Sequence, residues 1–438
     1  MNAALAAREA YADAFARRER SAISPPWLAA LRRDARARFE ALGFPHVRLE
    51  EWRFTNPAPL TQAVFADAAL ATGPVPPLPA LGAWDRVELA LVNGRYAPDL
   101  ARLPGLPGGA WVGGLAAAIA NPIVADRIAR TLGAIAPWQE RAFVALNTAL
   151  IDDGILVHVA PDVKLTAPVH VGHAIQRHVA GPVAAHPRVL VIADRGARLT
   201  VIEDFRGSQR AGDFVNSVIE FDLGEGAEVE HVSLLGHAPE SLHVGAAFAR
   251  LGAGAKFASR SIALGGRLLR RDVHVTFAGP GGEATIDGLY VTSGSDLVDH
   301  HTTADHAVPG CSSRELFKGV LTGASRAVFN GAVIIRPDAQ KSDAGQQNQN
   351  LLLSEDATID TKPELQIFAD DVKCAHGATV GQLSDEALFY LQARGIGAEA
   401  ARAMLTHAFA REVVDRIGHE GLRADVDAIV ERRMESLR

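Results

Sequence analysis

The chain of 438 residues is long enough for two or three domains or one elongated one, and its composition, 48% hydrophobic and 22% charged, is typical of a soluble protein with a buried core. A formal net charge of -7 argues against bulk attraction to nucleic acid or to an anionic membrane. The sequence has no uncharged apolar run long enough for a membrane span, its N-terminal segment is charged throughout, and it has two cysteines, so we expect no membrane span, no secretory signal, no disulfide framework and a cytoplasmic location.

The N-terminal part of the chain is predicted to form two helices. The segment AREAYADAFARRER is rich in helix-forming residues, and Pro25–Pro26 interrupts it. A second helix covers about residues 27–42, with apolar residues along one face, and stops at Gly43. Residues 44–140 are mixed, and the Asn93–Gly94 pair within VELALVNGRY predicts a type I′ hairpin.

From about residue 143 to residue 380, short β-rich runs recur with a repeated turn signal. The signal appears as GARL, GAEV, GAKF and GEAT, which begin at Gly196, Gly226, Gly254 and Gly282. The successive spacings are 30, 28 and 28 residues. A fixed period of this size, with a glycine turn before each strand, predicts stacked coils in a parallel β-helix. A β-sandwich is the alternative, but a sandwich does not require the period.

The C-terminal region is predicted to be helical. Ser384 begins one helix, with Asp385 and Glu386 as acidic residues in its first turn, and Gly395 ends it. The next helix has an apolar stripe formed by Ala401, Leu405, Ala408, Phe409 and Val413. These helices are expected to cap the end of the solenoid or to present a docking surface for a partner, and the two roles are compatible. The predicted division is therefore an N-terminal helical and mixed region at 1–142, a parallel β-helix core at 143–380, and a C-terminal helical region at 381–438.

The segment ELQIFADDVKCAHGATVG, residues 364–381, holds the first candidate site. Alternating apolar residues predict that the run up to Cys374 is a strand, and alternate residues of a strand face the same side. Cys374 and His376 should therefore project together. A thiol and an imidazole can form a soft metal or sulfur site, whereas the structural interpretation is a buried thiol beside a hydrogen-bonded core histidine.

A second group of potential ligands lies in DHHTTADHAVPGC, residues 299–311, and comprises Asp299, His300, His301, His306 and Cys311. Such a group could bind iron or zinc. The segment lacks the C-x-x-C or H-x-x-x-H spacing of a tetrahedral site, so we favour solvated loop histidines and an inert buried thiol. The polar segment 336–353, rich in glutamine and asparagine, is interpreted as a hydrogen-bonded ladder between coils.

The sequence argues against two classes of enzyme. It has no G-x-x-x-x-G-K-[ST] run, since GGRLLRR at 265–271 lacks the lysine and its Ser/Thr neighbour, so we expect no ATP site on this chain. A β-helix enzyme acting on polysaccharide would need aromatic sugar platforms and carboxylate clusters, and the chain has only 5 Trp and 4 Tyr.

Several long segments carry a family resemblance. They are GFPHVRLEEWRFTNP at 43–57, LVNGRY at 91–96, LNTALIDDGILVHV at 146–159 and, most densely, residues 313–397. These segments resemble the SufB/SufD family of iron–sulfur cluster assembly proteins. The resemblance implies a right-handed parallel β-helix flanked by helical segments, in agreement with the repeat period.

Within that family the chain resembles the SufD type. It has KCAHGAT before the C-terminal helices, and Leu391 follows Phe389–Tyr390 where SufB-like chains often have a cysteine. The resemblance implies a non-enzymatic scaffold subunit that pairs with SufB and docks the SufC ATPase on its C-terminal helices. It also implies that His376 and, less directly, Cys374 handle a transient Fe–S cluster or iron at the SufB interface.

Two ligands cannot complete the coordination of such a cluster, so the remaining ligands would come from a partner or a small molecule. Alone, the chain could also pair with itself through the surface it offers to SufB. A purely structural partner without a metal role is the alternative.

Overall fold

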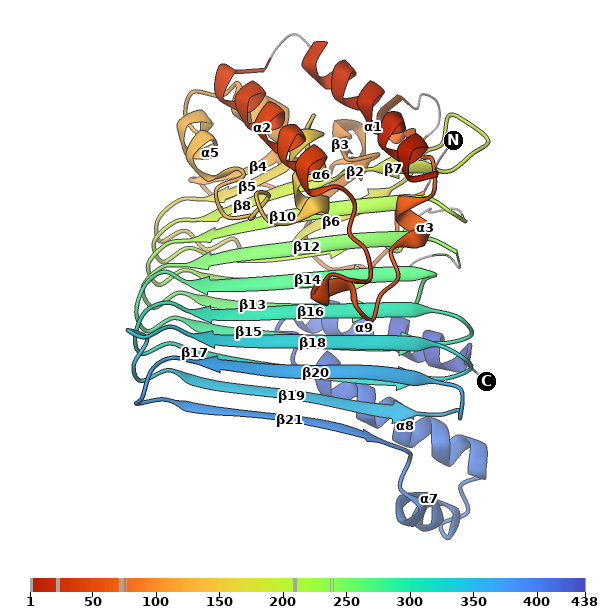
Figure 1. Ribbon diagram of the computed structural model, residues 1–438. Coiled ribbons are helices and arrows are strands. Elements are labelled where there is room, and N and C mark those ends of the chain that lie inside the picture. Colours follow the sequence, from red (N-terminus) through yellow and green to blue (C-terminus); the bar gives the residue numbers. More distant parts are fainter. Residues whose placement is uncertain are drawn as a thin grey trace.

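The computed structural model describes residues 3–20, 24–70, 75, 77–207, 211–236, 238 and 240–437. Two long sheets lie face to face and form a solenoid, with α1 and α2 at the end that contains the earliest strands (Figure 1). The C-terminal helices lie beside the lower coils, and α7 projects beyond the last strand. This arrangement confirms the predicted mainly β fold, a parallel β-solenoid flanked by N-terminal and C-terminal helices.

The helical elements within the described residues are α1 Ala3–Arg20, α2 Pro26–Leu42, η1 Glu50–Trp52, α3 Ala58–Thr61, η2 Ala68–Leu70, η3 Pro98–Leu100, α4 Leu115–Ile119, α5 Ala125–Thr131, α6 Ala142–Ala149, α7 Asp385–Gln392, α8 Ala398–Val414 and α9 Glu420–Glu435. Across the described ranges, no helix combines the length and the apolar character that crossing a membrane requires.

The strands are β1 Ala66–Asp67, β2 Val87–Val92, β3 Arg95–Tyr96, β4 Ala110–Gly114, β5 Ile155–Val159, β6 Val169–Ala174, β7 Val183–Ala185, β8 Arg188–Ala193, β9 Arg198–Asp204, β10 Phe214–Leu223, β11 Glu228–Leu235, β12 Leu242–Leu251, β13 Lys256–Ala263, β14 Leu268–Phe277, β15 Glu283–Thr292, β16 Leu297–His306, β17 Ser312–Leu321, β18 Arg326–Ile335, β19 Asp343–Leu352, β20 Thr358–Ile367 and β21 Lys373–Gly381.

The strands alternate between the two sheets. Sheet 1 has the order β20-β18-β16-β14-β12-β10-β8-β5-β4, and β1 and β7 lie off this path. Sheet 2 has the order β21-β19-β17-β15-β13-β11-β9-β6-β2-β3. Each coil therefore contributes one strand to each sheet, and neighbouring coils pair in parallel. At the first end the pairs β2–β3 and β4–β5 are antiparallel.

The repeated glycine turns lead into strands of sheet 2, as the period predicts. Gly196, Gly226 and Gly254 have φ values of 66°, 63° and 62°, in the left-handed region that favours glycine. They precede β9, β11 and β13. In the fourth turn the left-handed residue is Gly281, with φ 72°, and the following glycine leads into β15. The hairpin is confirmed as well, because Asn93 and Gly94 have φ values of 54° and 80° between β2 and β3.

Inward-facing apolar residues of both sheets form the main core, for example Val191, Phe221, Leu251 and Phe277, all buried. The N-terminal helices cover the outer face of sheet 1 over its early coils. There Phe39, Trp52 and Phe143 pack against residues such as Phe214 and Leu242. The helix predictions for this region are confirmed by α1 and α2.

The C-terminal helices pack on the outer face of sheet 2, so the prediction that they cap the solenoid is wrong. One buried apolar cluster joins the helices to the sheet. From the helical region it contains Val413 of α8, Ile417 just after α8, and Val426 and Val430 of α9. From sheet 2 it contains the outward-facing residues Val232, Leu234, Ile262 and Leu289. Because that face is apolar, the helices cover it, and the edge of the last coil stays open. The buried positions of α8 also differ from the predicted stripe: Thr406 and Ala410 are buried, and Ala408 is exposed.

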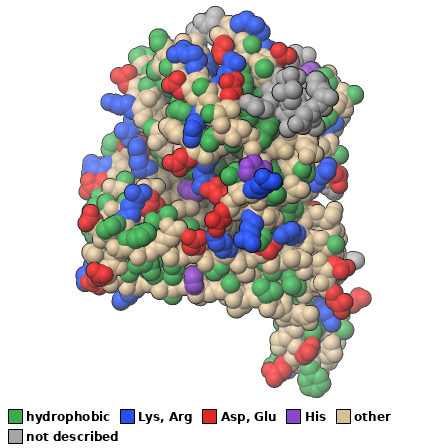
Figure 2. All heavy atoms as spheres, in the orientation of Figure 1, with side chains coloured by type: hydrophobic (Ala, Val, Ile, Leu, Met, Phe, Trp, Pro, Cys, Tyr) green, Lys and Arg blue, Asp and Glu red, His purple; other side chains and the backbone are tan. Residues whose placement is uncertain are grey.

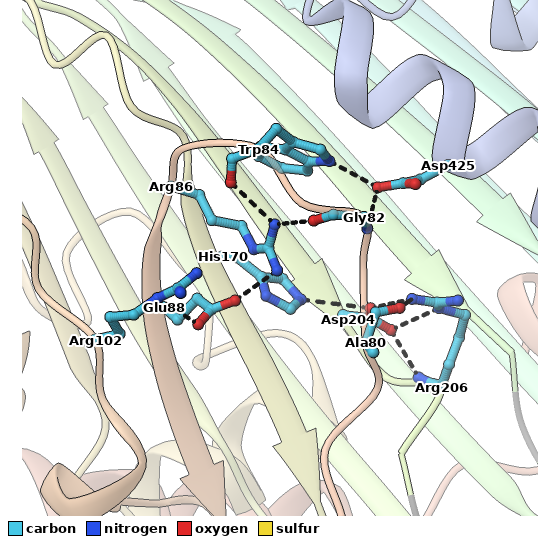
Figure 3. Close-up of polar contacts among 10 residues, drawn as sticks. All are labelled: Ala80, Gly82, Trp84, Arg86, Glu88, Arg102, His170, Asp204, Arg206 and Asp425. Carbon is cyan, nitrogen blue, oxygen red and sulfur yellow. Dashed lines mark hydrogen bonds and ion pairs between the residues drawn. The ribbon is translucent and has the colours of Figure 1, made fainter.

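The segment before β2 ties these helices to the early coils (Figure 3). Asp425 of α9 accepts hydrogen bonds from Trp84 Nε1 at 2.7 Å and from Gly82 N at 2.8 Å. The Arg86 guanidinium donates to the Gly82 carbonyl at 2.6 Å and lies over the Trp84 ring at 4.6 Å from its centroid. Residues 80–86 thus form a strap across sheet 2 that ends at β2.

Candidate functional site

The segment with the first candidate site is not one strand. β20 ends at Ile367, a turn follows, and β21 begins at Lys373. The prediction of a single strand from residue 364 to Cys374 is therefore wrong, because Val372 belongs to the turn and not to the alternation of β20. Cys374 and His376 instead share β21, the last strand of the solenoid, where their i, i+2 spacing places both side chains on the inward face.

Cys374 is half-buried and packs with Leu365 and Val372 against the core of the last coils. Burial raises the pKa of the Cys374 thiol, and the neighbouring Asp343 carboxylate acts in the same direction. The metal-binding form of cysteine is the thiolate, so this environment favours the protonated, packing form.

His376 is exposed although it faces inward, because no further coil covers it. In the described part of the structure, neither of its ring nitrogens has a hydrogen-bond partner. Its register partner in the preceding coil is Gln346, whose own register partner is Glu315. The solenoid thus presents an accessible imidazole at its open end, above two buried polar side chains.

Glu315 and Gln346 were not recognised as site residues in the sequence. Gln346 Nε2 donates to Glu315 Oε2 at 3.0 Å, and the Thr302 hydroxyl donates to the same oxygen at 2.7 Å. Burial raises the pKa of Glu315 to about 7, despite the opposing hydrogen bonds from Thr302 and Gln346. The signal was present in the spacing, since Glu315, Gln346 and His376 are 31 and 30 residues apart, one coil each.

A second polar group lies deeper in the solenoid and is closed to solvent. Glu203 Oε2 accepts from Arg271 at 2.9 Å and is 3.2 Å from His231 Nε2, and all three side chains are buried. Burial alone would raise the pKa of Glu203, but Arg271 and His231 outweigh it and lower that pKa to about 2. This buried group of three side chains links strands of the early and middle coils, β9, β11 and β14.

Residues 299–306 lie on strand β16 and Cys311 lies in the turn that follows it, so the prediction of solvated loop histidines is wrong. His300 and His306 face inward and are buried, and His306 Nε2 is 2.9 Å from Ser313 Oγ. Asp299 and His301 face outward under the N-terminal segment, 3.0 Å apart, and Thr55 donates to Asp299 at 2.6 Å. Strand alternation therefore separates these side chains onto opposite faces.

Cys311 is a buried thiol, as expected, and its Sγ is 3.5 Å from the Gly279 carbonyl oxygen. Burial raises its pKa. Throughout the described residues, no three or more His, Cys, Asp and Glu side chains are grouped so that they could hold a metal ion. Cys374 and His376 are therefore at most part of a site on this chain.

These features define a helix-flanked parallel β-solenoid that presents an imidazole and a thiol at its open end. Residues 175–409 match the family described as SUF system FeS cluster assembly, SufBD core domain, and residues 81–171 match the SufBD protein N-terminal region. The chain belongs to the SufB/SufD family of iron–sulfur cluster assembly proteins.

Similar proteins point to the SufD type within that family. The iron–sulfur cluster assembly protein SufD of Escherichia coli is 32% identical over 394 residues, which cover 90% of each chain. An iron–sulfur cluster assembly SufBD family protein of Synechocystis is 31% identical over 387 residues, 86% of this chain and 84% of that protein. The SufD protein of Bacillus subtilis is 27% identical over 312 residues, 68% of each chain.

Proposed function

We propose that this chain is a non-enzymatic, cytoplasmic scaffold subunit of the SufD type. It pairs with SufB through its last coil, docks the SufC ATPase on its C-terminal helices, and presents His376 to iron or to a nascent Fe–S cluster as cargo. The observation that carries the proposal is the open last coil, on which an accessible imidazole faces the position that a further coil would occupy.

The last coil has the character of an interface. β20 and β21 are the final strands of their sheets, so each has one edge without a neighbouring strand in the described structure. Such edges favour pairing with another chain. Large apolar side chains are exposed beside them: Ile367 is 42% exposed, Phe368 62% and Val380 49%. A partner solenoid placed there would cover His376 and could supply the missing ligands.

Between the two candidate ligands, His376 has the stronger case. Imidazole binds iron without losing a proton from its neutral form, and His376 is accessible. The raised pKa of Cys374 and its packing against Leu365 favour a structural role until a partner or metal changes its surroundings. A site with few thiolates would hold a cluster loosely, as transfer to a recipient requires.

The C-terminal helices offer a separate surface for the ATPase. α7 projects from the solenoid, and hydrophobic and acidic side chains gather on this projection (Figure 2). On it Phe389 is 73% exposed and Tyr390 56% exposed. Next to α7, a groove of about 730 Å³ lies between α8, α9 and the last coils, lined by residues that include Leu353, Leu383 and Met404. Exposed aromatic residues beside an apolar groove are typical of interaction sites.

The test is the substitution His376→Ala in a co-purified complex with SufB and SufC. We expect the complex to assemble in normal stoichiometry while its iron and acid-labile sulfide content falls several-fold. The matched control is His46→Ala, which removes an exposed histidine of the segment between α2 and η1. An intact complex with unchanged cluster content would overturn the ligand role of His376.

A further inference from the structure

The last three coils contain a column of polar side chains beneath His376. Glu315 on β17, Gln346 on β19 and His376 on β21 are consecutive register partners, and adjacent strands lie about 4.8 Å apart. Glu315 and Gln346 are 3% and 1% exposed, respectively. Only the last member of the column reaches solvent, so the column connects a buried carboxyl group with the accessible imidazole.

The buried amide of Gln346 is held in one orientation. Its Nε2 donates to Glu315 Oε2, which the Thr302 hydroxyl also approaches. On the facing strand β18, Gly331 makes the room, because a Cβ there would lie 2.1 Å from Gln346 Nε2. A side chain at position 331 would therefore displace the amide. This glycine explains how a long polar side chain fits between two packed sheets.

The same amide has an acceptor without a partner. In the described residues, Gln346 Oε1 is buried and accepts no hydrogen bond. A buried carbonyl oxygen without a donor costs about 1–3 kcal/mol. The side chain above it in register is His376, whose neutral imidazole has one N–H donor and, in the described structure, no partner of its own.

We propose that Gln346 is a positioning residue for His376, with Glu315 as its anchor. In the proposed arrangement the His376 ring turns so that Gln346 Oε1 accepts a hydrogen bond from one ring N–H, and this bond selects one tautomer of the neutral imidazole. The other ring nitrogen is then deprotonated and points to the open end, where it can bind a metal. Histidine ligands generally donate their second N–H to a carbonyl or carboxylate in this way. The importance of the tautomer for iron rests on the proposed function, but the hydrogen bond does not.

Glu315 accepts the hydrogen bond from Gln346 whether its carboxyl group is neutral or charged. Its raised pKa of about 7 means that the carboxyl group tolerates the protonated form near neutral pH. In either form its Oε2 can accept from Gln346. Glu315→Gln should therefore preserve the column, whereas Glu315→Leu should release the amide and with it the preference of His376 for one tautomer.

The experiment uses the metal-free full-length chain, labelled with imidazole-¹⁵N histidine and studied by two-bond ¹⁵N–¹H correlation at about pH 8.5, where an ordinary imidazole is neutral. The His376 signals are those absent from His376→Ala. We expect one tautomer to predominate in the natural chain and in Glu315→Gln, and a solvent-like mixture in Gln346→Leu. The matched control is Gln347→Leu, on the same strand but on the outward, exposed face.

A second measurement connects the column to metal. Anaerobic titration with iron(II) alone should show binding weakened about 10- to 100-fold in Gln346→Leu and unchanged in Gln347→Leu. If the ratio of the two His376 tautomers is the same in the natural chain and in Gln346→Leu, the positioning role is overturned. A clear tautomer change, together with unaltered iron binding in His376→Ala, would instead leave the positioning role standing and overturn the proposed metal role of His376.

Discussion

The Trp84 indole N–H donates a 2.7 Å hydrogen bond to Asp425 Oδ2, and the two residues are 341 positions apart in the chain. The same carboxylate oxygen also accepts from the backbone of Gly82 at 2.8 Å. The strap before β2 therefore meets the last helix at one carboxylate. Through it, a helix of the proposed ATPase-docking surface is fixed to the N-terminal end of the solenoid.

Removing that carboxylate should loosen α9 without unfolding the solenoid. A hydrogen bond to a charged group contributes about 1.5–3 kcal/mol, so we expect Asp425→Ala to lower the free energy of unfolding by about that amount. Hydrogen exchange of the α9 amides should accelerate at the same time. The control is Asp415→Ala, which removes an exposed partner of Arg411 and should cost less than about 0.5 kcal/mol. Unchanged exchange in α9 would mean that the apolar cluster alone holds this helix.

The protein should lose stability on acidification below about pH 6.5. Burial lowers the pKa of His173 and of His300 to about 4, against 6.5 for an ordinary histidine. Between these values the unfolded chain binds protons that the folded chain does not, so stability falls as the pH drops from 6.5 to 4. Glu203, with its pKa lowered to about 2, adds a further loss below pH 4.5. Urea unfolding at a series of pH values measures this slope.

One substitution isolates the contribution of His300. Its ring stacks at 5.6 Å on Tyr290 and lies 5.3 Å from Phe317, and within the described structure neither ring nitrogen has a hydrogen-bond partner. His300→Phe should keep the aromatic packing and lose less stability between pH 6.5 and pH 4. The exposed His178→Ala should retain the natural slope. An equal slope in His300→Phe would contradict the assignment.

The exposed aromatic pair on α7 should be required for ATPase docking. Deleting the whole C-terminal region would expose the apolar outer face of sheet 2, so point substitutions are the sharper test. We expect Phe389→Ala with Tyr390→Ala to reduce SufC capture at least tenfold with unchanged thermal stability, because both side chains face solvent. Val47→Ala, at another exposed apolar residue, is the control. Full capture by the double variant would place the docking surface elsewhere.

Alone, the chain should self-associate through its open end at micromolar concentrations. Phe368→Lys with Val380→Lys places charges beside the edges of β20 and β21, which discourages strand pairing. Light scattering should show a dimer for the natural chain and for the control Val47→Lys, and a monomer for the double variant. A natural chain that stays monomeric would show that the edge needs a different partner.

The sequence predicted the features that local chemistry specifies. The glycine period predicted the coils, the Asn93–Gly94 pair predicted the hairpin, and the apolar run that stops at Gly43 predicted α2. Each of these features depends on residues that are close together in the chain. β16 was predicted to be a loop because inward residues such as His300 and Thr302 are polar, which removes the apolar alternation. The ladder expected at 336–353 is present on β19, where Gln346 donates to Glu315 of the preceding coil. The division of the chain at residues 142 and 380 remains a prediction.

The residues of the candidate site could be predicted from the sequence, but the residues that surround them could not. The Cys374–His376 pair could be read directly, but its surroundings depend on register between coils, which brings Gln346 and Glu315 beneath it. The side on which α8 and α9 pack depends on the apolar outer face of sheet 2, formed by residues such as Val232 and Ile262 that lie far away in the chain.

The two ends of the solenoid differ, and this difference limits assembly. At the first end, the antiparallel strands β3 and β4 finish the sheets beneath the N-terminal helices, whereas among the described residues no strand pairs with the outer edge of the last coil. Two chains that meet at their bare ends leave only finished ends facing outward. Because β3 and β4 are short and antiparallel to their neighbours, they offer a further parallel coil a poor template, and we expect association through the last coil to stop at a pair.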